Sequence, residues 1–264
     1  MIEVMLVPAL ACLVLIGIHV YFGVQVIQRG IIFIDLCLAQ VAALGGLLTR
    51  LVLGTESSSM TWAGSIFATV VAAGFFAALA HRRKALPMEA IIGIIYALSA
   101  ATAMLVIHLT ATDSHDLQRM LSGELLFAQL PAIAWTAVFY ALVAVAHVGL
   151  FRGRWKNSAP SVLGDFVFYA ALGLVVTSSV KLAGVLAVFT FLIVPAFCAQ
   201  SLFSTFRAQL LGGWALGALT AMAGIAASVL WDLPTGLAVV CAFAVPFAIT
   251  LAVVWWRPAI LVGE

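Results

Sequence analysis

About nine apolar stretches, each long enough to cross a lipid bilayer, fill almost the whole chain. A spanning helix needs about 20 mostly apolar residues, because the hydrocarbon core is about 30 Å thick. Eight to ten spans are compatible with the pattern. It leaves open whether the second span is one straight helix and whether the sixth ends before Lys181. The predicted spans are Met5–Ile27, Ile31–Leu53, Met60–Ala80, Met88–Leu109, Pro131–Phe151, Val162–Val180, Leu182–Phe203, Ala208–Trp231 and Gly236–Trp256.

Composition excludes a water-soluble fold. Hydrophobic residues make up 65% of the chain and charged residues 8%, whereas a soluble domain carries about 25% charged residues. The gaps between spans are mostly short, and we find no linker or internal repeat. The sequence therefore predicts an all-α, polytopic membrane helix bundle that forms a single transmembrane domain over residues 1–264. Small residues inside the second and eighth spans indicate close helix packing, since lipid provides no hydrophobic drive between helices.

The basic residues predict the orientation of the chain. Only Arg50, Arg119 and Lys181 lie in or beside the gaps after even-numbered spans. By the positive-inside rule, the C-terminus is cytoplasmic and the N-terminus lies outside. The other nine basic residues all follow odd-numbered spans: Arg29, Arg82, Arg83, Lys84, Arg152, Arg154, Lys156, Arg207 and Arg257.

The sequence lacks the motifs of an enzyme or a motor. It has no G-x-x-x-x-G-K-[ST] phosphate loop, no H-E-x-x-H and no G-x-S-x-G. The four cysteines form no C-x-x-C pair, so packing is the expected role of each. No basic segment precedes Met5, so the first span is expected to remain in the mature protein. With so few polar side chains an enzyme active site would be hard to assemble, and we expect the chain to bind no cofactor of its own.

A few polar residues lie where lipid makes them costly. Asp35 is either a helix-start carboxylate favoured by the helix dipole or a ligand lining a pathway. Gln40 lies deeper and either bonds to another helix or contributes to the same pathway. On one regular helix these two positions are about 140° apart, so they share no face unless the helix is broken.

Four further positions are candidates for gating or structural roles: Lys181, Pro195, Glu124 and Asp232. Lys181 is an interface anchor or a gate at the outer end of the sixth span. Pro195 is expected to kink the seventh span, because proline removes a backbone donor. Asp232, followed by Pro234 and Gly236, predicts a turn outside the membrane. The long outer gap Thr110–Leu130 has apolar residues at helical spacing and predicts a short surface helix.

Together these features resemble the permease subunit of ABC importers in the zinc/manganese/iron uptake family, over nearly the whole chain. Phe33–Val41 occupies the place of the family's F-x-G-D-x-x-x-H-A motif. Lys181-x-x-Gly184-x-Leu186, running into Leu192-Ile193-x-Pro195-Ala196, is similar to its most characteristic stretch. Three further segments resemble the family in the right order. Glu89–Gly93 resembles the acidic start of its fourth span, Ser122–Leu126 with Glu124 its glycine-acid-leucine segment, and Asp232–Gly236 the turn before its last span.

One departure concerns the cargo. The family's Asp and His stand four residues apart, and here Leu36 and Gln40 align with them. An amide is a poorer ligand for a transition metal than imidazole. Asp35 and Gln40 are therefore the metal-pathway candidates, while the identity of the metal stays open.

The resemblance implies a mechanism and partners. An extracytoplasmic metal-binding protein would deliver a divalent cation to a dimer of the permease in the bacterial inner (plasma) membrane. A cytoplasmic ABC ATPase subunit would consume ATP, and no nucleic acid is involved. Its docking element is expected in Gln200–Gln209, as a loop with a short helix, with Gln200, Phe203, Phe206 and Arg207 as coupling residues. An ordinary polar turn is the alternative there.

Three other functions remain open from the sequence. The same architecture could carry a metal chelate or a vitamin. A stand-alone secondary transporter would need no ATPase and usually has internal repeats with buried titratable groups. An intramembrane redox protein would need histidines paired at matched depths.

Overall fold

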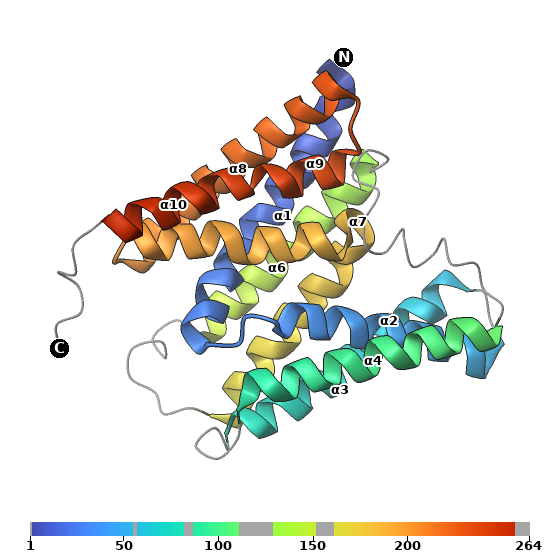
Figure 1. Cartoon of the computed structure of the whole chain (residues 1–264). Helices are drawn as coiled ribbons and strands as arrows, with labels where there is room; N and C mark the ends of the chain where they lie inside the picture. Colours follow the sequence, from blue (N-terminus) through green and yellow to red (C-terminus); the bar gives the residue numbers. More distant parts are fainter. Residues whose placement is uncertain (1, 55–56, 82–86, 111–128, 152–160, 257–264) are drawn as a thin grey trace. The chain divides into compact units, whose positions relative to one another are not determined.

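Every regular element in the described part of the chain is a helix (Figure 1). The computed structural model describes residues 2–54, 57–81, 87–110, 129–151 and 161–256. Eight helices there are long and apolar enough to cross a membrane, with α9 and α10 counted as one. The all-α, polytopic prediction is confirmed. The helices are α1 (Ile2–Arg29), α2 (Ile34–Leu53), α3 (Ser58–Ala80), α4 (Met88–Thr110), α6 (Leu130–Phe151), α7 (Val162–Leu202), α8 (Phe206–Trp231), α9 (Thr235–Ala242) and α10 (Ala244–Trp256).

Most predicted spans coincide with one helix to within a few residues. The second begins later than predicted, at Ile34, because a turn that starts at Gly30 precedes it. From Ile34 to Leu53 it is one uninterrupted helix, which answers the question that the pattern left open. The predicted surface helix between Thr110 and Leu130, and the basic gaps 82–84 and 152–156, lie outside the described residues.

The largest difference concerns α7, which has 41 residues. A straight helix of that length would extend about 60 Å, twice the thickness of the hydrocarbon core. The backbone of Gly184 is non-helical, with φ 79° and ψ 163°, so α7 consists of two helices, 162–183 and 185–202. These are the predicted sixth and seventh spans. The sixth does not stop before Lys181 but continues to residue 183.

The chain clusters into two compact units, which we describe separately. Unit 1 comprises residues 1–29, 124–133 and 186–264, and unit 2 comprises residues 30–123 and 134–185. In unit 2, α2 packs against α3 and α4. Gly45 lies so close to Gly64 and Ala68 of α3 that a side chain there would overlap them. The close approach predicted for the glycines of the second span is confirmed.

Hydroxyl groups join other helices of unit 2. Thr69 of α3 and Thr177 of α7 lie 3.1 Å apart, oxygen to oxygen. The Tyr140 hydroxyl of α6 contacts Ser178 at 3.2 Å and also bonds to Ser179. Such interhelical hydrogen bonds stabilise helix pairs where no water competes.

In unit 1, α8 packs against α1 and α9. Gly213 lies against Val20 and Gly217 against Ile16, both of α1. The indole nitrogen of Trp214 donates to the Gly17 carbonyl at 2.9 Å. The predicted small-residue packing of the eighth span is therefore present.

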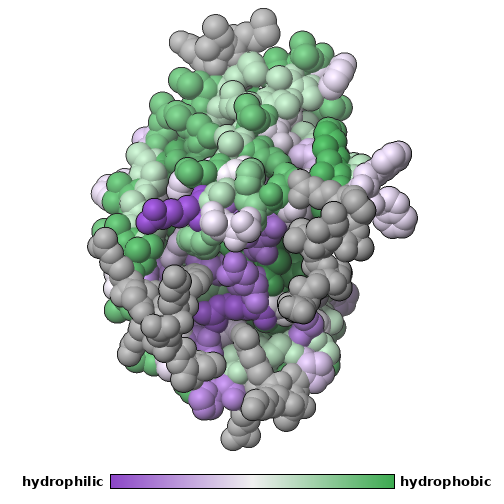
Figure 2. All heavy atoms as spheres, turned by 90° about the vertical axis from the view of Figure 1, so that its left-hand side faces the viewer, coloured by the Kyte–Doolittle hydropathy of each residue, from purple (hydrophilic) through white to green (hydrophobic). Residues whose placement is uncertain are grey.

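Large apolar side chains are exposed on many helices, as a membrane protein requires. Trp135 is 75% exposed, Val145 72% and Leu219 73%. On the face shown in Figure 2, apolar residues cover much of the described surface. Lipid is the solvent that makes such a surface stable.

Candidate functional sites

Asp35 is a buried carboxylate in the first turn of α2. Its side chain is 1% exposed, so it does not reach toward water. The carboxylate interacts with the backbone amides of Leu36 and of Asp35 itself. Neither oxygen makes a hydrogen bond of good geometry. The helix dipole favours an acid here. Because the carboxylate is buried without a strong hydrogen-bond partner, its oxygens are also suited to accept a cation.

The structure does not bring Asp35 and Gln40 together on one face. Gln40 is also buried, at 8% exposure. Because α2 is unbroken between them, the two side chains point about 140° apart. No group of three or more His, Cys, Asp or Glu residues that could hold a metal ion occurs among the described residues.

Glu89, in the first turn of α4, lies beside the turn that leads into Asp35. Its Oε1 accepts a hydrogen bond of 2.6 Å from the backbone amide of Ile32. Its Oε2 is buried without a hydrogen-bond partner. Sequence reasoning noted Glu89 only within a family motif. The positional signal that could have found it is an acid at a helix start facing a glycine turn.

Lys181 and Trp62 mark the opposite end of unit 2. The Lys181 ammonium lies 5.9 Å from the centre of the Trp62 ring. Trp62 is near the start of α3, which follows the end of α2, whereas Ile32 and Glu89 join the starts of α2 and α4. The helix directions within unit 2 therefore alternate as predicted. The assignment of the Lys181 end to the outside remains a prediction.

The predicted coupling segment is a tight connection between α7 and α8. Only Phe203, Ser204 and Thr205 separate the two helices, so the expected short helix is absent here. Thr205 caps α8 by accepting a hydrogen bond from the amide of Ala208. The Gln209 side chain donates to the Phe203 carbonyl at 2.9 Å. This three-residue turn is therefore held by two side chains.

The four predicted coupling residues lie around this turn. Gln200 donates to the Val24 carbonyl of α1 at 2.8 Å, which places the turn near the end of α1 that carries Arg29. The Phe206 ring meets Tyr21 edge-on, with centroids 6.3 Å apart. Phe203 is 42% exposed, and Arg207 is exposed as well. The fixed side chains orient the turn, and the exposed ones can contact a partner.

The remaining candidates divide into structural positions and one that lies outside the described residues. The helix continues through Pro195, which packs against Gly213 and Gly217, and the non-helical residue of α7 is Gly184. The predicted kink at Pro195 therefore stays a prediction, and the non-helical residue Gly184 lies eleven residues before it. Asp232 ends α8 in a left-handed conformation, φ 51°, and confirms the predicted turn. Glu124 lies outside the described residues.

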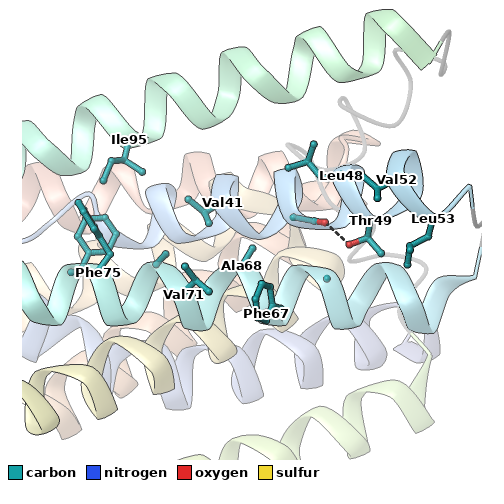
Figure 3. Close-up of a pocket in the computed structure, with 14 residues that line it drawn as sticks. Val41, Leu48, Thr49, Val52, Leu53, Phe67, Ala68, Val71, Phe75 and Ile95 are labelled. Atoms are coloured by element: carbon teal, nitrogen blue, oxygen red, sulfur yellow. Dashed lines mark hydrogen bonds between the residues drawn. The ribbon is translucent and has the colours of Figure 1, made fainter.

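A groove of about 770 Å³ lies between α2 and α3, with Ile95 of α4 at its edge (Figure 3). Its lining is apolar apart from Thr49, whose hydroxyl donates to the Gly45 carbonyl. A groove of this kind offers nothing to a cation, so it is no candidate for a cation path.

The fold and these sites define a class of protein. The chain is an all-helical, multi-pass membrane protein with a buried acid at a helix start and a connecting turn that two side chains hold. Membrane-spanning subunits of transporters belong to this class.

Comparisons with known proteins identify the family. A family model described as the ABC 3 transport family matches residues 1–254, and the chain belongs to this family. Among solved structures, it is similar to PsaBC from Streptococcus pneumoniae in complex with Fab. The TM-score is 0.74 at 18% identity, over 93% of this chain and 90% of that chain. The comparison with curated proteins gave no match.

Proposed function

We propose that this protein is the permease subunit of an ATP-driven importer that moves a divalent transition-metal ion into the bacterial cytoplasm. Zinc, manganese and ferrous iron are the candidate cargoes. The family match over residues 1–254 is the observation that carries the proposal. The shared fold with PsaBC supports it, since nearly the whole chain takes part in the match.

The turn between α7 and α8 is the proposed docking element for a separate ATPase subunit. A sequence without a phosphate loop needs a partner to hydrolyse ATP. The exposed Phe203 and Arg207 offer an aromatic contact and a charge. Because the side chains of Gln209 and Thr205 form hydrogen bonds across this turn, a displacement of the turn would pass into both helices.

Asp35 is the proposed contact for the cation on the predicted cytoplasmic side of unit 2. Carboxylate oxygens suit manganese and also bind zinc, whereas imidazole is the ligand better suited to zinc and iron. A second copy of the permease would supply a second Asp35, and an extracytoplasmic binding protein would deliver the ion.

Reconstitution tests this proposal. The permease is purified with the products of neighbouring genes, placed in liposomes, and assayed for uptake of zinc, manganese and ferrous iron with and without ATP. We expect uptake of at least one ion that depends on ATP and on a co-purifying ATPase. Uptake without any ATPase would favour a secondary transporter, and uptake of a chelate or vitamin alone would replace the cargo.

The docking assignment has its own test. Arg207→Ala is expected to lower uptake about tenfold or more by weakening coupling to hydrolysis. Arg50→Ala is the matched control, since this arginine lies in the last turn of α2, at the predicted outer end. Equal effects of the two substitutions, or full uptake by Arg207→Ala, would refute the assignment.

A further inference from the structure

Gly184 interrupts α7 close to the point where the chain passes between its two units. The boundary between the units falls between residues 185 and 186. With φ 79° and ψ 163°, Gly184 occupies a backbone region that is essentially restricted to glycine. The helix therefore ends and restarts at a residue that adopts several conformations at little cost.

A second glycine with positive φ lies at another boundary. Gly30, φ 63°, follows α1 and is the first residue of unit 2. Among the described residues one more glycine has positive φ, Gly54 at φ 56°, and it lies inside unit 2 between α2 and α3. All three follow or interrupt helices, but only Gly30 and Gly184 lie where the chain changes unit.

Each half of α7 is fastened to its own unit. Before the break, Thr177 bonds to Thr69, and Ser178 lies 3.2 Å from the Tyr140 hydroxyl, all within unit 2. After the break, the Phe191 ring meets Phe243 at 5.7 Å within unit 1. Movement of one unit would therefore carry its half of α7 with it, and the backbone change would concentrate at Gly184.

The remaining passage in the described residues lies in α6. It falls between residues 133 and 134, so only the first four residues of the helix, 130–133, cluster with unit 1. A single terminal turn opens at low cost compared with a helix interior. This passage does not tie the units as a continuous helix through its middle would.

We propose that Gly184 and Gly30 are hinges about which the two units move as rigid bodies. Hinges of this kind are a few terminal or loop residues that absorb the change in φ and ψ. The use of this motion for alternating access rests on the proposed function, but the motion itself can be measured without any cargo.

Distances between spin labels test the hinge directly. The labels are placed on exposed positions of the two units, with Val71→Cys in unit 2 and Leu219→Cys in unit 1. The four native cysteines are replaced by serine or alanine, and the full chain is measured in nanodiscs, alone and with its ATPase subunit and ATP. We expect two distance populations. Gly184→Ala should shift their ratio about tenfold or more, because alanine strains one backbone state and favours a continuous helix.

Gly54→Ala is the matched control, since it makes the same change at a positive φ within one unit. It should leave the ratio unchanged, whereas Gly30→Ala should shift it as Gly184→Ala does. One narrow distance in every condition, or equal shifts for Gly54→Ala and Gly184→Ala, would overturn the proposal. If Gly184→Ala does not fold, the distance populations of Gly30→Ala and of the unmodified chain are compared instead. Failure of metal uptake with the distance shifts intact would refute the proposed function and not the hinge.

Discussion

Glu89 of α4 accepts a 2.6 Å hydrogen bond from the backbone amide of Ile32, 57 residues earlier in the sequence. Ile32 lies in the turn between α1 and α2, three residues before the buried Asp35. The contact therefore fixes the start of α2, since an amide in this turn has no partner within a helix. The contact connects Glu89, which the sequence marks only as part of a family motif, to the segment that leads into Asp35, the first candidate for a metal contact.

Removing this acceptor should destabilise unit 2. Glu89→Ala leaves the Ile32 amide without its partner, and we expect a loss of about 1–3 kcal/mol in the free energy of unfolding. Glu89→Gln keeps an acceptor oxygen and should cost less, about 1 kcal/mol or below. Thermal or denaturant unfolding in detergent measures both. A Glu89→Ala protein as stable as the unmodified chain would mean that the contact does not form in solution.

Two glycines of α1 provide a matched pair for testing packing in unit 1. A side chain at Gly23 would collide with the Leu192 carbonyl of α7, whereas one at Gly17 would meet nothing within 4 Å. Gly23→Ala should therefore destabilise the fold by about 1–3 kcal/mol, and Gly17→Ala should change it by about 0.5 kcal/mol or less. The comparison uses unfolding in detergent. Similar values for the two variants would contradict the close approach of α1 and α7.

The contact between Lys181 and Trp62 should contribute a small, measurable coupling. At 5.9 Å from the ring centre, the ammonium is within the range of a cation–π interaction of about 0.5–1 kcal/mol. A double-mutant cycle of Lys181→Gln and Trp62→Leu isolates that term. Additive effects would show that Lys181 acts only as an interface anchor.

The number and position of the spans could be predicted because bilayer thickness imposes their length. The junction inside α7 could not be located to the residue. Lys181 looks like the end of a span, yet an exposed lysine is tolerated in a helix when it interacts with an aromatic ring such as Trp62. Gly184, three residues later, is one of 21 glycines in the sequence. Only its dihedral angles distinguish it from the glycines that pack inside helices.

The candidate sites were predicted less completely, for a physical reason. Sequence spacing gives the angle between Asp35 and Gln40 on a helix, and that angle held. Spacing does not give burial, so the choice between an acid at the interface and a buried acid had to wait for the structure. The partnership of Glu89 with Ile32 depends on packing between α4 and the turn before α2, which no local pattern contains.

Asp35 is where stability and transport should separate most clearly. Its carboxylate is buried without a good hydrogen bond, and a buried polar group without a partner costs about 1–3 kcal/mol, more when it is charged. The helix dipole returns only about 0.3–1 kcal/mol, so Asp35→Asn should raise the unfolding midpoint. If the carboxylate contacts the cation, the same substitution should lower ATP-dependent metal uptake about tenfold or more.

Asp165→Asn controls for the loss of an acid at a helix start, because Asp165 occupies the first turn of α7 and is also buried. It should leave metal uptake near that of the unmodified protein. Stability and uptake are measured on the same liposome preparations, so that poor insertion is not mistaken for lost transport. Unchanged uptake by Asp35→Asn, together with a raised midpoint, would make Asp35 a helix-start residue only. Equal losses for both variants would point to the charge at the membrane surface and away from a contact with the ion.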